Sequence, residues 1–456
     1  MSDPIAERPV PATSALRQPP GLYLLFAVEM WERFSYYGMR ALMVLYLVDT
    51  RHGGLGWDRV PAQRLYGWYG FFAYLLPVVG GVLADQRLGT HRAMVIGALV
   101  IAAGHFCLAT PPLSAFFVGM ALIVIGTGFF KSNVSTMVGQ LYGEDDPRRD
   151  PGFTIFYMGV NVGALLGPII CGYLAESPRW GWHWGFGAAG VGMVIGLLVY
   201  LRLKSRYLPG IGIVPNRRAA EARGERASGF SSEERDRVLA LLIIYFFTIF
   251  FWMAFEQAGS SMNLFAAERT CRLIHGWIFP ASWFQSVNSA VILIAAPIFA
   301  GLWTALAQRG REPGTPAKMA AGLALLAGGF LFMVVGAKRS EGGVLVSPLW
   351  LVAAYTFHTF GELCLSPIGL SLVTRLAPFR LASLFMGLWF LATAAGELLA
   401  GQLAALTDRV ARGEIFRLLG GQADFYLIFV VSGSVAALGL TLLRSKLRRL
   451  MHGRDT

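Results

Sequence analysis

The sequence predicts an all-α integral membrane protein with twelve membrane-spanning helices, and three observations support this. Of the 456 residues, 55% are hydrophobic and only 14% are charged, which is too little charge for the surface of a soluble domain. Apolar runs of roughly 20 residues, the length that crosses a bilayer, recur from end to end. Basic residues are divided unequally between alternate loops, with 25 of the 39 Lys and Arg residues on one side and 11 on the other.

Each expected span is an apolar run bounded by polar or turn-forming residues. The twelve runs are residues 21–48, 64–84, 91–110, 112–141, 152–174, 183–203, 237–265, 279–306, 318–336, 347–373, 381–404 and 422–444. Because Lys and Arg stay mainly on the cytoplasmic side, we expect a multi-pass protein of the plasma (inner) membrane with both termini in the cytoplasm. The net charge of +12 therefore reflects membrane topology, and no basic face for nucleic acid is expected.

The first span carries charge where an apolar helix should have none. At 100° per residue, its polar side chains fall on one stripe, opposite Met30, Phe34 and Leu42. The stripe consists of Glu29, Glu32, Arg33, Tyr36, Tyr37 and Arg40. Since each ion would cost several kcal/mol against lipid, the stripe is expected to line a wet cavity.

Further polar residues lie in later spans, and several have two readings. Tyr66 and Tyr69 of the second span are expected in an interfacial aromatic belt, whereas Tyr74 lies deeper and is the better pocket candidate. Lys131 in the fourth span either snorkels to the interface or points inward. Asn161 in the fifth span either holds two helices together or contacts a ligand.

The second half contains its own intramembrane carboxylates. Glu256 and Glu362 lie in the middle of their spans, where an ionised carboxylate needs a partner or a proton. His358 precedes Glu362 by one turn and is expected to be a structural histidine with satisfied hydrogen bonds, with a proton relay as the alternative.

A polar segment divides the chain into two near-equal halves, which is typical of two-bundle transporters with a site at the bundle interface. The expected divisions are a flexible cytoplasmic arm (1–20), a six-helix bundle (21–203), a cytoplasmic linker (204–236), a second six-helix bundle (237–445) and a basic tail (446–456). The string G-x-x-x-D-x-x-x-G-x-x-R at residues 81–92 resembles the cytoplasmic hinge loop of major facilitator transporters, although an ordinary tight turn would also explain it.

Four motifs resemble the proton-dependent oligopeptide transporter family, a branch of the major facilitator fold. The first span contains E-x-x-E-R-F-x-Y-Y-G from Glu29, and the fifth contains F-x-x-F-Y-M-x-V-N-V-G-A-L from Phe153. Residues 255–259 (F-E-Q-A-G) and 361–367 (G-E-x-x-x-S-P) match further family strings. The resemblance extends from about residue 21 to residue 445.

This resemblance implies a role for each matching residue. The implied substrate-binding residues are Arg33, Tyr36, Tyr37, Tyr74, Lys131, Asn161, Trp252, Asn288, Glu362, Ser366 and Trp389. The implied proton-coupling residues are Glu29, Glu32, Arg33, Glu256 and Glu362, and the implied salt bridges between the halves are Arg40–Glu256 and Lys131–Glu362. No metal or cofactor is implied apart from the proton gradient.

Two departures from the family pattern qualify this comparison. Bacterial members commonly have two extra helices between the halves, whereas residues 204–236 are too short and polar to hold them. The family usually has Asn where this sequence has Glu397, so the chain holds an additional carboxylate near the expected cavity.

The resulting hypothesis is a monomeric proton-coupled symporter that imports di- and tripeptides by alternating access. A zwitterionic peptide needs a cation at one end of its site and an anion at the other, and the two halves supply these separately. The alternatives are a related transporter for another small nitrogenous substrate or a drug, and a membrane-embedded enzyme. The enzyme is disfavoured because the four cysteines form no C-x-x-C pair and the seven histidines form no metal or nucleophile motif.

Overall fold

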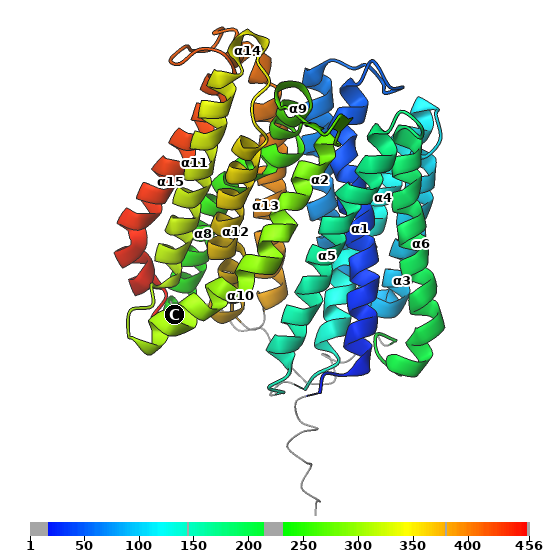
Figure 1. Cartoon of the computed structure of the whole chain (residues 1–456). Coiled ribbons are helices and arrows are strands. Elements are labelled where there is room, and N and C mark those ends of the chain that lie inside the picture. Colours follow the sequence, from blue (N-terminus) through cyan, green and yellow to red (C-terminus); the bar gives the residue numbers. More distant parts are fainter. Residues whose placement is uncertain (1–16, 144–145, 214–230, 379–380, 454–456) are drawn as a thin grey trace, which may run out of the picture.

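Two bundles of long helices make up the structure, a computed structural model that describes residues 17–143, 146–213, 231–378 and 381–453. In Figure 1 the first bundle lies on the right and the second on the left. The first contains α1 (Pro20–Val48), α2 (Arg59–Leu83), α3 (Thr90–Leu108), α4 (Leu113–Gly139), α5 (Arg149–Glu176) and α6 (Trp182–Tyr207). The second contains α8 (Ser232–Phe255), α10 (Ser286–Gln308), α11 (Thr315–Arg339), α12 (Leu349–Leu376), α13 (Ala382–Ala404) and α15 (Gln422–Leu450).

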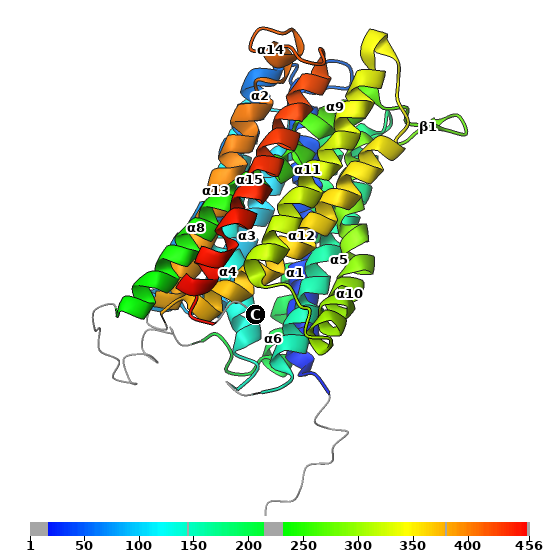
Figure 2. The same cartoon turned by 90° about the vertical axis from the view of Figure 1, so that its left-hand side faces the viewer.

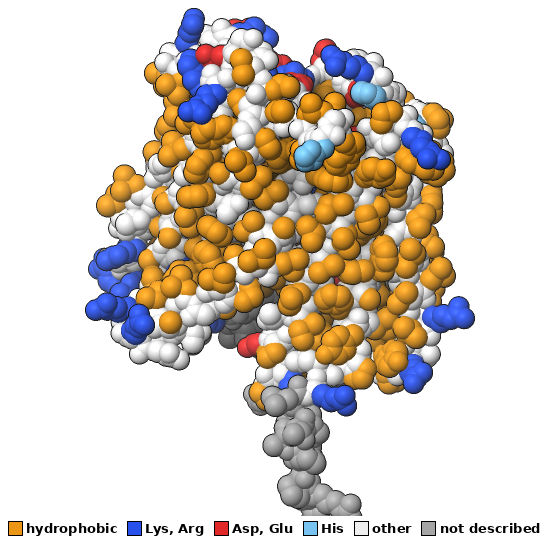
Figure 3. All heavy atoms as spheres, viewed as in Figure 1, with side chains coloured by type: hydrophobic (Ala, Val, Ile, Leu, Met, Phe, Trp, Pro, Cys, Tyr) orange, Lys and Arg blue, Asp and Glu red, His pale blue; other side chains and the backbone are white. Residues whose placement is uncertain are grey.

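These twelve long helices confirm the predicted fold class. Ten of them are long and apolar enough to span a membrane, and the other two, α1 and α12, are the helices that carry Glu29, Glu32 and Glu362. Figure 3 shows hydrophobic side chains covering the middle of the molecule, with Lys and Arg gathered at its two ends. This arrangement matches a protein surrounded by lipid.

Close packing against α5 fixes the orientation of α1 and therefore of its charged stripe. Gly163 of α5 lies against the backbone of Met30 and the Cβ of Arg33, and Gly167 lies against Gly38. Side chains at these two glycines would overlap α1, so the glycines allow the helices to approach this closely. In this orientation Arg40 of the stripe reaches Glu256 of the second bundle.

The seventh predicted span is broken, contrary to the expectation of one helix over 237–265. Helix α8 begins at Ser232 with a capping box formed by Ser231 and Glu234, and it ends at Phe255. The 3₁₀ segment η2 (Glu256–Gly259) and α9 (Ser261–Arg269) follow. The break brings Gly259 against the Tyr66 ring of α2, where any side chain at position 259 would overlap that ring.

Other predicted boundaries also differ from those observed. A small hairpin, β1 (Leu273–Ile274) and β2 (Trp277–Ile278), projects from the end of the molecule away from the termini (Figure 2). The predicted linker is helical to Tyr207 and again from Ser232, and its residues 214–230 lie outside the described residues. The predicted tail is helical as far as Leu450, and most of the predicted N-terminal arm is not described. The short helix α14 (Thr407–Ala411) lies between α13 and α15.

The two bundles meet along α2–α13 and α5–α10, with α1 close to η2 and α9. Polar contacts join them in the half of the molecule away from the termini. Glu176 of α5 accepts hydrogen bonds from the backbone N–H groups of Ala281 (2.7 Å) and Ser282 (3.0 Å) and from the Ser282 hydroxyl (2.6 Å). The Asn263 amide donates to the Ala41 carbonyl at 2.9 Å. That side of the molecule is therefore closed.

Candidate functional site

The first charge group of α1 is a local cluster formed within one helix. Arg33 Nε contacts Glu29 Oε1 at 3.1 Å and also pairs with Glu32 Oε2. All three side chains are buried. Arg33 Nη2 and one oxygen of each carboxylate have no hydrogen-bond partner in the described structure. The cluster therefore retains one donor and two acceptors that a ligand, water or proton can occupy.

The second charge group of α1 crosses between the bundles. Arg40 forms an ion pair with Glu256 of η2, and its Nε donates to the Tyr66 hydroxyl of α2 at 2.7 Å. That hydroxyl lies 3.4 Å from Glu256 Oε2. The structure thus forms the first of the two salt bridges implied by the sequence. The break after α8 is what places Glu256 here.

Lys131 of α4 points into the protein rather than toward the interface. Its ammonium lies 3.6 Å from the centroid of the Tyr74 ring and 5.9 Å from that of Phe390. Helix α4 continues beyond it to Gly139, so the snorkelling interpretation is wrong. An ammonium over an aromatic face gains attraction without being neutralised.

The expected Lys131–Glu362 salt bridge is not formed within the described residues. Glu362 of α12 instead accepts a hydrogen bond from the Asn288 amide of α10 at 2.8 Å. The same amide lies 3.0 Å from the Thr359 hydroxyl. The two charges belong to different bundles. In this conformation Glu362 is held by a neighbour of its own bundle, whereas Lys131 lies over Tyr74 of its own bundle and near Phe390 of the second. Both stay available for an opposite charge between them.

The remaining predicted site residues fall into two groups by exposure. Partly exposed are Tyr37, Tyr74, Asn288 and Ser366, whereas Tyr36, Asn161, Trp252 and Trp389 are buried. The Tyr37 ring lies 5.8 Å from the Arg40 guanidinium, measured to the ring centroid. Trp389 instead packs within the second bundle, against Tyr245 and Gly369.

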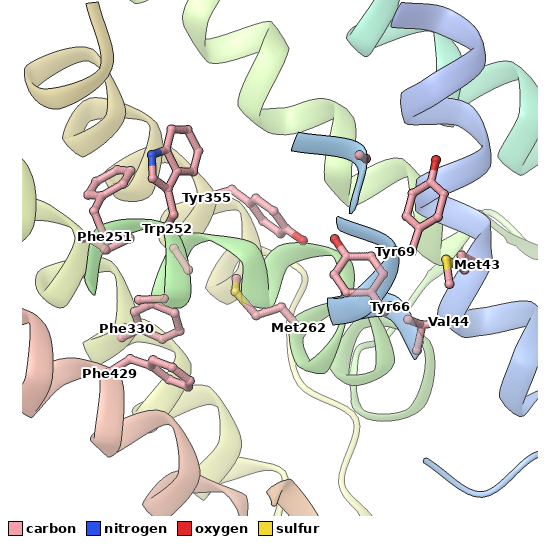
Figure 4. Packing of buried hydrophobic residues seen from close by; sticks show 14 of the residues in the cluster. Met43, Val44, Tyr66, Tyr69, Phe251, Trp252, Met262, Phe330, Tyr355 and Phe429 are labelled. Carbon is pink, nitrogen blue, oxygen red and sulfur yellow. The ribbon is translucent and has the colours of Figure 1, made fainter. Parts of the chain in front are cut away.

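The expectation of an aromatic belt at Tyr66 and Tyr69 is wrong, because both side chains are almost completely buried, at 1% and 3% exposed. Figure 4 shows them among the packed side chains at the interface. Their spacing along α2 does not distinguish a lipid-facing from a protein-facing stripe. A buried tyrosine usually finds a partner for its hydroxyl. The Tyr66 hydroxyl has Arg40, whereas the Tyr69 hydroxyl has no hydrogen-bond partner in the described structure.

Contacts in the structure bear on two other sequence interpretations. The Asn161 amide donates to the Tyr157 carbonyl of its own helix at 3.0 Å, so it does not hold two helices together through that bond. His358 is buried against Phe330, with ring centroids 4.4 Å apart, and neither ring nitrogen has a hydrogen-bond partner in the described structure. His358 is a packed histidine as predicted, but its hydrogen bonds are not satisfied.

No group of three or more His, Cys, Asp or Glu side chains within the described residues could hold a metal ion. Two grooves are lined mainly by apolar side chains and by none of the buried charges. One runs between α8 and α15, and the other is bordered by α1, α3, α5 and α6. The charged interface is therefore the candidate functional site.

Two helical bundles with buried opposite charges at their interface define a multi-pass membrane transporter of the major facilitator type. The sequence matches the POT family over residues 91–208 and 224–418. The chain belongs to the POT family.

Relatives and solved structures agree over nearly the whole chain. A peptide transporter of Yersinia enterocolitica is 38% identical, covering 83% of this chain and 86% of its own length. A di-/tripeptide transporter of Lactococcus lactis is 32% identical, covering 95% of this chain and 97% of its own. The crystal structure of a peptide transporter, POT, in complex with sulfate is 35% identical, with a TM-score of 0.85 and coverage of 96% and 97%. A POT family transporter in complex with 5-aminolevulinic acid is 30% identical, with a TM-score of 0.85 and coverage of 94% and 97%.

Proposed function

We propose that the protein imports di- and tripeptides together with protons across the plasma membrane by alternating access. The observation that carries this proposal is the division of charge between the bundles. Arg33 and Lys131 belong to the first bundle and Glu362 to the second, and each keeps some capacity for a further ionic contact. A peptide with a free carboxylate and a free amine complements this arrangement. Relatives described as di-/tripeptide transporters support the substrate class.

A zwitterionic peptide needs cations at one end of the site to bind its carboxylate and an anion at the other end to bind its amine. The unpaired Nη2 of Arg33 and the ammonium of Lys131 would receive the peptide carboxylate, with Tyr74 beneath the ammonium. Glu362, held by Asn288, would receive the peptide amine. Charge-assisted hydrogen bonds of this kind contribute about 1.5–3 kcal/mol each. Partly exposed Tyr37 and Ser366 would border the peptide side chains.

Proton coupling follows from the ion pair that joins the bundles. Protonation of Glu256 would remove its charge and release Arg40, which weakens the closed side. Glu29 and Glu32 each have one carboxyl oxygen without a hydrogen-bond partner, so either could bind a proton. Protonation would weaken its ion pair with Arg33 and leave Arg33 available to the peptide carboxylate. A ligand or proton that binds one state better than the other shifts the balance between states.

We infer that both termini lie in the cytoplasm, from the excess of Lys and Arg on that side. The closed half, which contains Glu176 and Ser282, then faces outward. One chain contributes both ends of the site, so we propose that the monomer is the working unit. We propose that the protein is a transporter and not an enzyme, and that the proton gradient is its source of energy.

A second candidate is transport of another small zwitterion. The structure of a family member in complex with 5-aminolevulinic acid favours it, because that compound also carries a carboxylate and an amine. The two candidates differ in whether a peptide competes with the smaller molecule and drives its exchange.

The decisive experiment is uptake of a labelled dipeptide into proteoliposomes with an imposed pH gradient. We expect accumulation by the wild type and loss of gradient-driven uptake, with exchange retained, in Glu32→Gln. Lys131→Ala should lower dipeptide affinity about 10–100-fold, the equivalent of about 1.5–3 kcal/mol. Wild-type uptake that ignores the pH gradient would contradict symport. Uptake of labelled 5-aminolevulinic acid for which dipeptides do not compete would favour the second candidate.

A further inference from the structure

The apolar groove of the first bundle, bordered by α1, α3, α5 and α6, contains none of the charges on which the proposed transport depends. It follows α6, which stands at the edge of that bundle (Figure 1), and its volume is about 650 Å³. Gly187 and Gly192 of α6 leave room for it, and the Phe34 ring of α1 lies against Gly192 at its floor. The groove therefore reaches the back of the helix that carries the charged stripe.

The groove has about the length of one leaflet of a bilayer. Its residues on α6 extend from His183 to Ile195, which is about 18 Å at 1.5 Å per residue. The hydrocarbon core of a bilayer is about 30 Å thick, so one leaflet contributes about 15 Å. His183 follows the first residue of α6, at the end of the molecule away from the termini. The groove therefore crosses the leaflet on that side, from its surface to the middle of the membrane.

Two tryptophans and an arginine lie at the surface end of the groove. Trp184 lines the groove, is 58% exposed and packs edge-on against Trp180, with ring centroids 5.1 Å apart. The Arg179 guanidinium in turn lies 5.1 Å from the centroid of the Trp180 ring. Because tryptophan rings are enriched at the level of the lipid headgroups, this end of the groove is expected at that level.

The charge of Arg179 is not neutralised within the described residues. Its side chain is exposed and lies over Trp180, and its backbone N–H bonds to the Ser177 hydroxyl. Glu176, three residues earlier, is occupied by Ala281 and Ser282 of the second bundle. The guanidinium is therefore available to an anion, and its planar donors match a phosphate group.

We propose that this groove binds one anionic phospholipid, with an acyl chain along α6 and the headgroup phosphate on Arg179. An acyl chain in the groove exchanges lipid contacts for equally apolar protein contacts, so it adds little preference by itself. The selection comes from the headgroup, because a net negative lipid gains from the unneutralised cation. The site is separate from the proposed peptide site, and its test requires no transport.

The test is native mass spectrometry of the full chain, delipidated and then given equal amounts of phosphatidylglycerol and phosphatidylcholine with identical acyl chains. In the wild type, phosphatidylglycerol should be favoured about fivefold in the first lipid bound, from about 1 kcal/mol per basic side chain and about 1.4 kcal/mol per decade. Arg179→Gln should remove this preference. Arg51→Gln is the matched control, because Arg51 is an exposed arginine between α1 and α2 at the same end of the molecule.

Gly187→Leu tests the groove itself. A Cβ added at position 187 meets the Ala109 Cβ at an ordinary 3.6 Å, so a larger side chain fits and fills the groove. The fraction of protein that carries a lipid of either kind should fall. Gly301→Leu is the matched control, because Gly301 is an exposed glycine of α10, outside the groove, where an added Cβ meets no described atom within 4 Å.

An equal ratio of the two lipids in the wild type, or an equal loss of preference in Arg179→Gln and Arg51→Gln, would overturn the proposal. So would unchanged lipid retention in Gly187→Leu, or dimers without lipid, which would assign the groove to a second copy of the chain. If Gly187→Leu does not fold, phosphatidylglycerol with a photoreactive acyl chain decides on the wild type. Cross-links within residues 183–195 support the proposal, and cross-links confined to other segments contradict it.

Discussion

The two charge groups of α1 centre on Arg33 and Arg40, which lie about two helical turns apart, and they are built differently. Arg33 finds Glu29 and Glu32 on its own helix, whereas Arg40 finds Glu256 on the other bundle. Both groups are buried. The first keeps its partners whatever the bundles do, because i and i+4 positions stay adjacent while the helix is intact. The second exists only while the bundles are together.

The difference teaches that burial alone does not decide the role of an intramembrane charge. A local cluster is suited to hold a ligand or a proton, since its geometry survives the conformational cycle. A pair that crosses the interface reports and stabilises one conformation. Four substitutions break or sharpen this contrast.

The largest effect is expected from Glu256→Ala, which leaves Arg40 buried without its partner. Removing one member of a buried ion pair costs about 3–5 kcal/mol. We expect a large fall in thermal stability in detergent, together with a shift away from the closed state. Spin-label distances between the α1–α2 loop and α14 measure that shift.

The control for this prediction is the double variant Glu256→Ala with Arg40→Met, which removes both charges and should recover most of the stability. Equal stability of the single and double variants would mean that Arg40 is solvated without Glu256. The Arg40–Glu256 pair would then not stabilise the closed state.

The next largest effect is expected from Arg33→Gln, which removes the cation of the local cluster. Dipeptide affinity should fall about 10–100-fold, the equivalent of about 1.5–3 kcal/mol. A dipeptide with an amidated C-terminus is the matched probe, because it lacks the carboxylate and should show little difference. The spin-label distance should remain at its wild-type value, and a change in it would erase the contrast with Arg40.

A smaller effect is expected at a second bundle-crossing pair, this one exposed. Arg59 of α2 contacts Glu268 of α9 at 2.7 Å and Asp408 of α14 at 3.1 Å. Exposed pairs contribute about 0.2–1 kcal/mol and are screened by salt. Arg59→Gln should therefore shift the bundle equilibrium slightly at low salt and not at high salt. A shift that persists in high salt would show that burial does not explain the difference in strength between the Arg40–Glu256 pair and the Arg59 pairs.

The smallest effect on the bundles is expected at Asp49, which ends α1 within the first bundle. Burial raises its pKa, but hydrogen bonds from the backbone of Arg51, His52 and Gly54 and from the Trp182 indole outweigh burial and hold the pKa below the usual 3.8. A lowered pKa in the folded state means stability that is present at neutral pH and is lost as pH falls below about 3.8.

Asp49→Asn should therefore remove this acid-side loss of stability, measured as melting temperature against pH in detergent. The transport rate at neutral pH should not change. An altered spin-label distance in this variant would contradict its assignment to contacts within one bundle.

Local patterns in the sequence predicted much of the fold. Apolar runs located the long helices, because crossing a bilayer demands a nearly fixed number of apolar residues. Where a predicted helix boundary was wrong, contacts with other helices had overridden the preference of the local sequence. The break at Glu256 coincides with contacts to Tyr66 of α2 and Arg40 of α1, and no pattern within residues 237–265 predicts it.

The candidate site was predictable in part. Helical spacing placed Glu29 and Arg33 on one face, and the structure pairs them. The burial of Tyr66 and the contact of the Lys131 ammonium with the Tyr74 ring were not predictable, because each depends on which neighbouring helix faces the side chain.

By itself, the sequence determined the membrane class, the helices and the composition of the charged stripe, because all three follow from hydropathy and from the geometry of a single helix. The tertiary structure decided which charges meet across the interface. It confirms the Arg40–Glu256 pair that the family resemblance implied, but it keeps Lys131 apart from Glu362 and encloses Glu397 against Gly70. The physical reason is that contact between bundles depends on how two rigid bodies are placed, and local sequence carries no record of that placement.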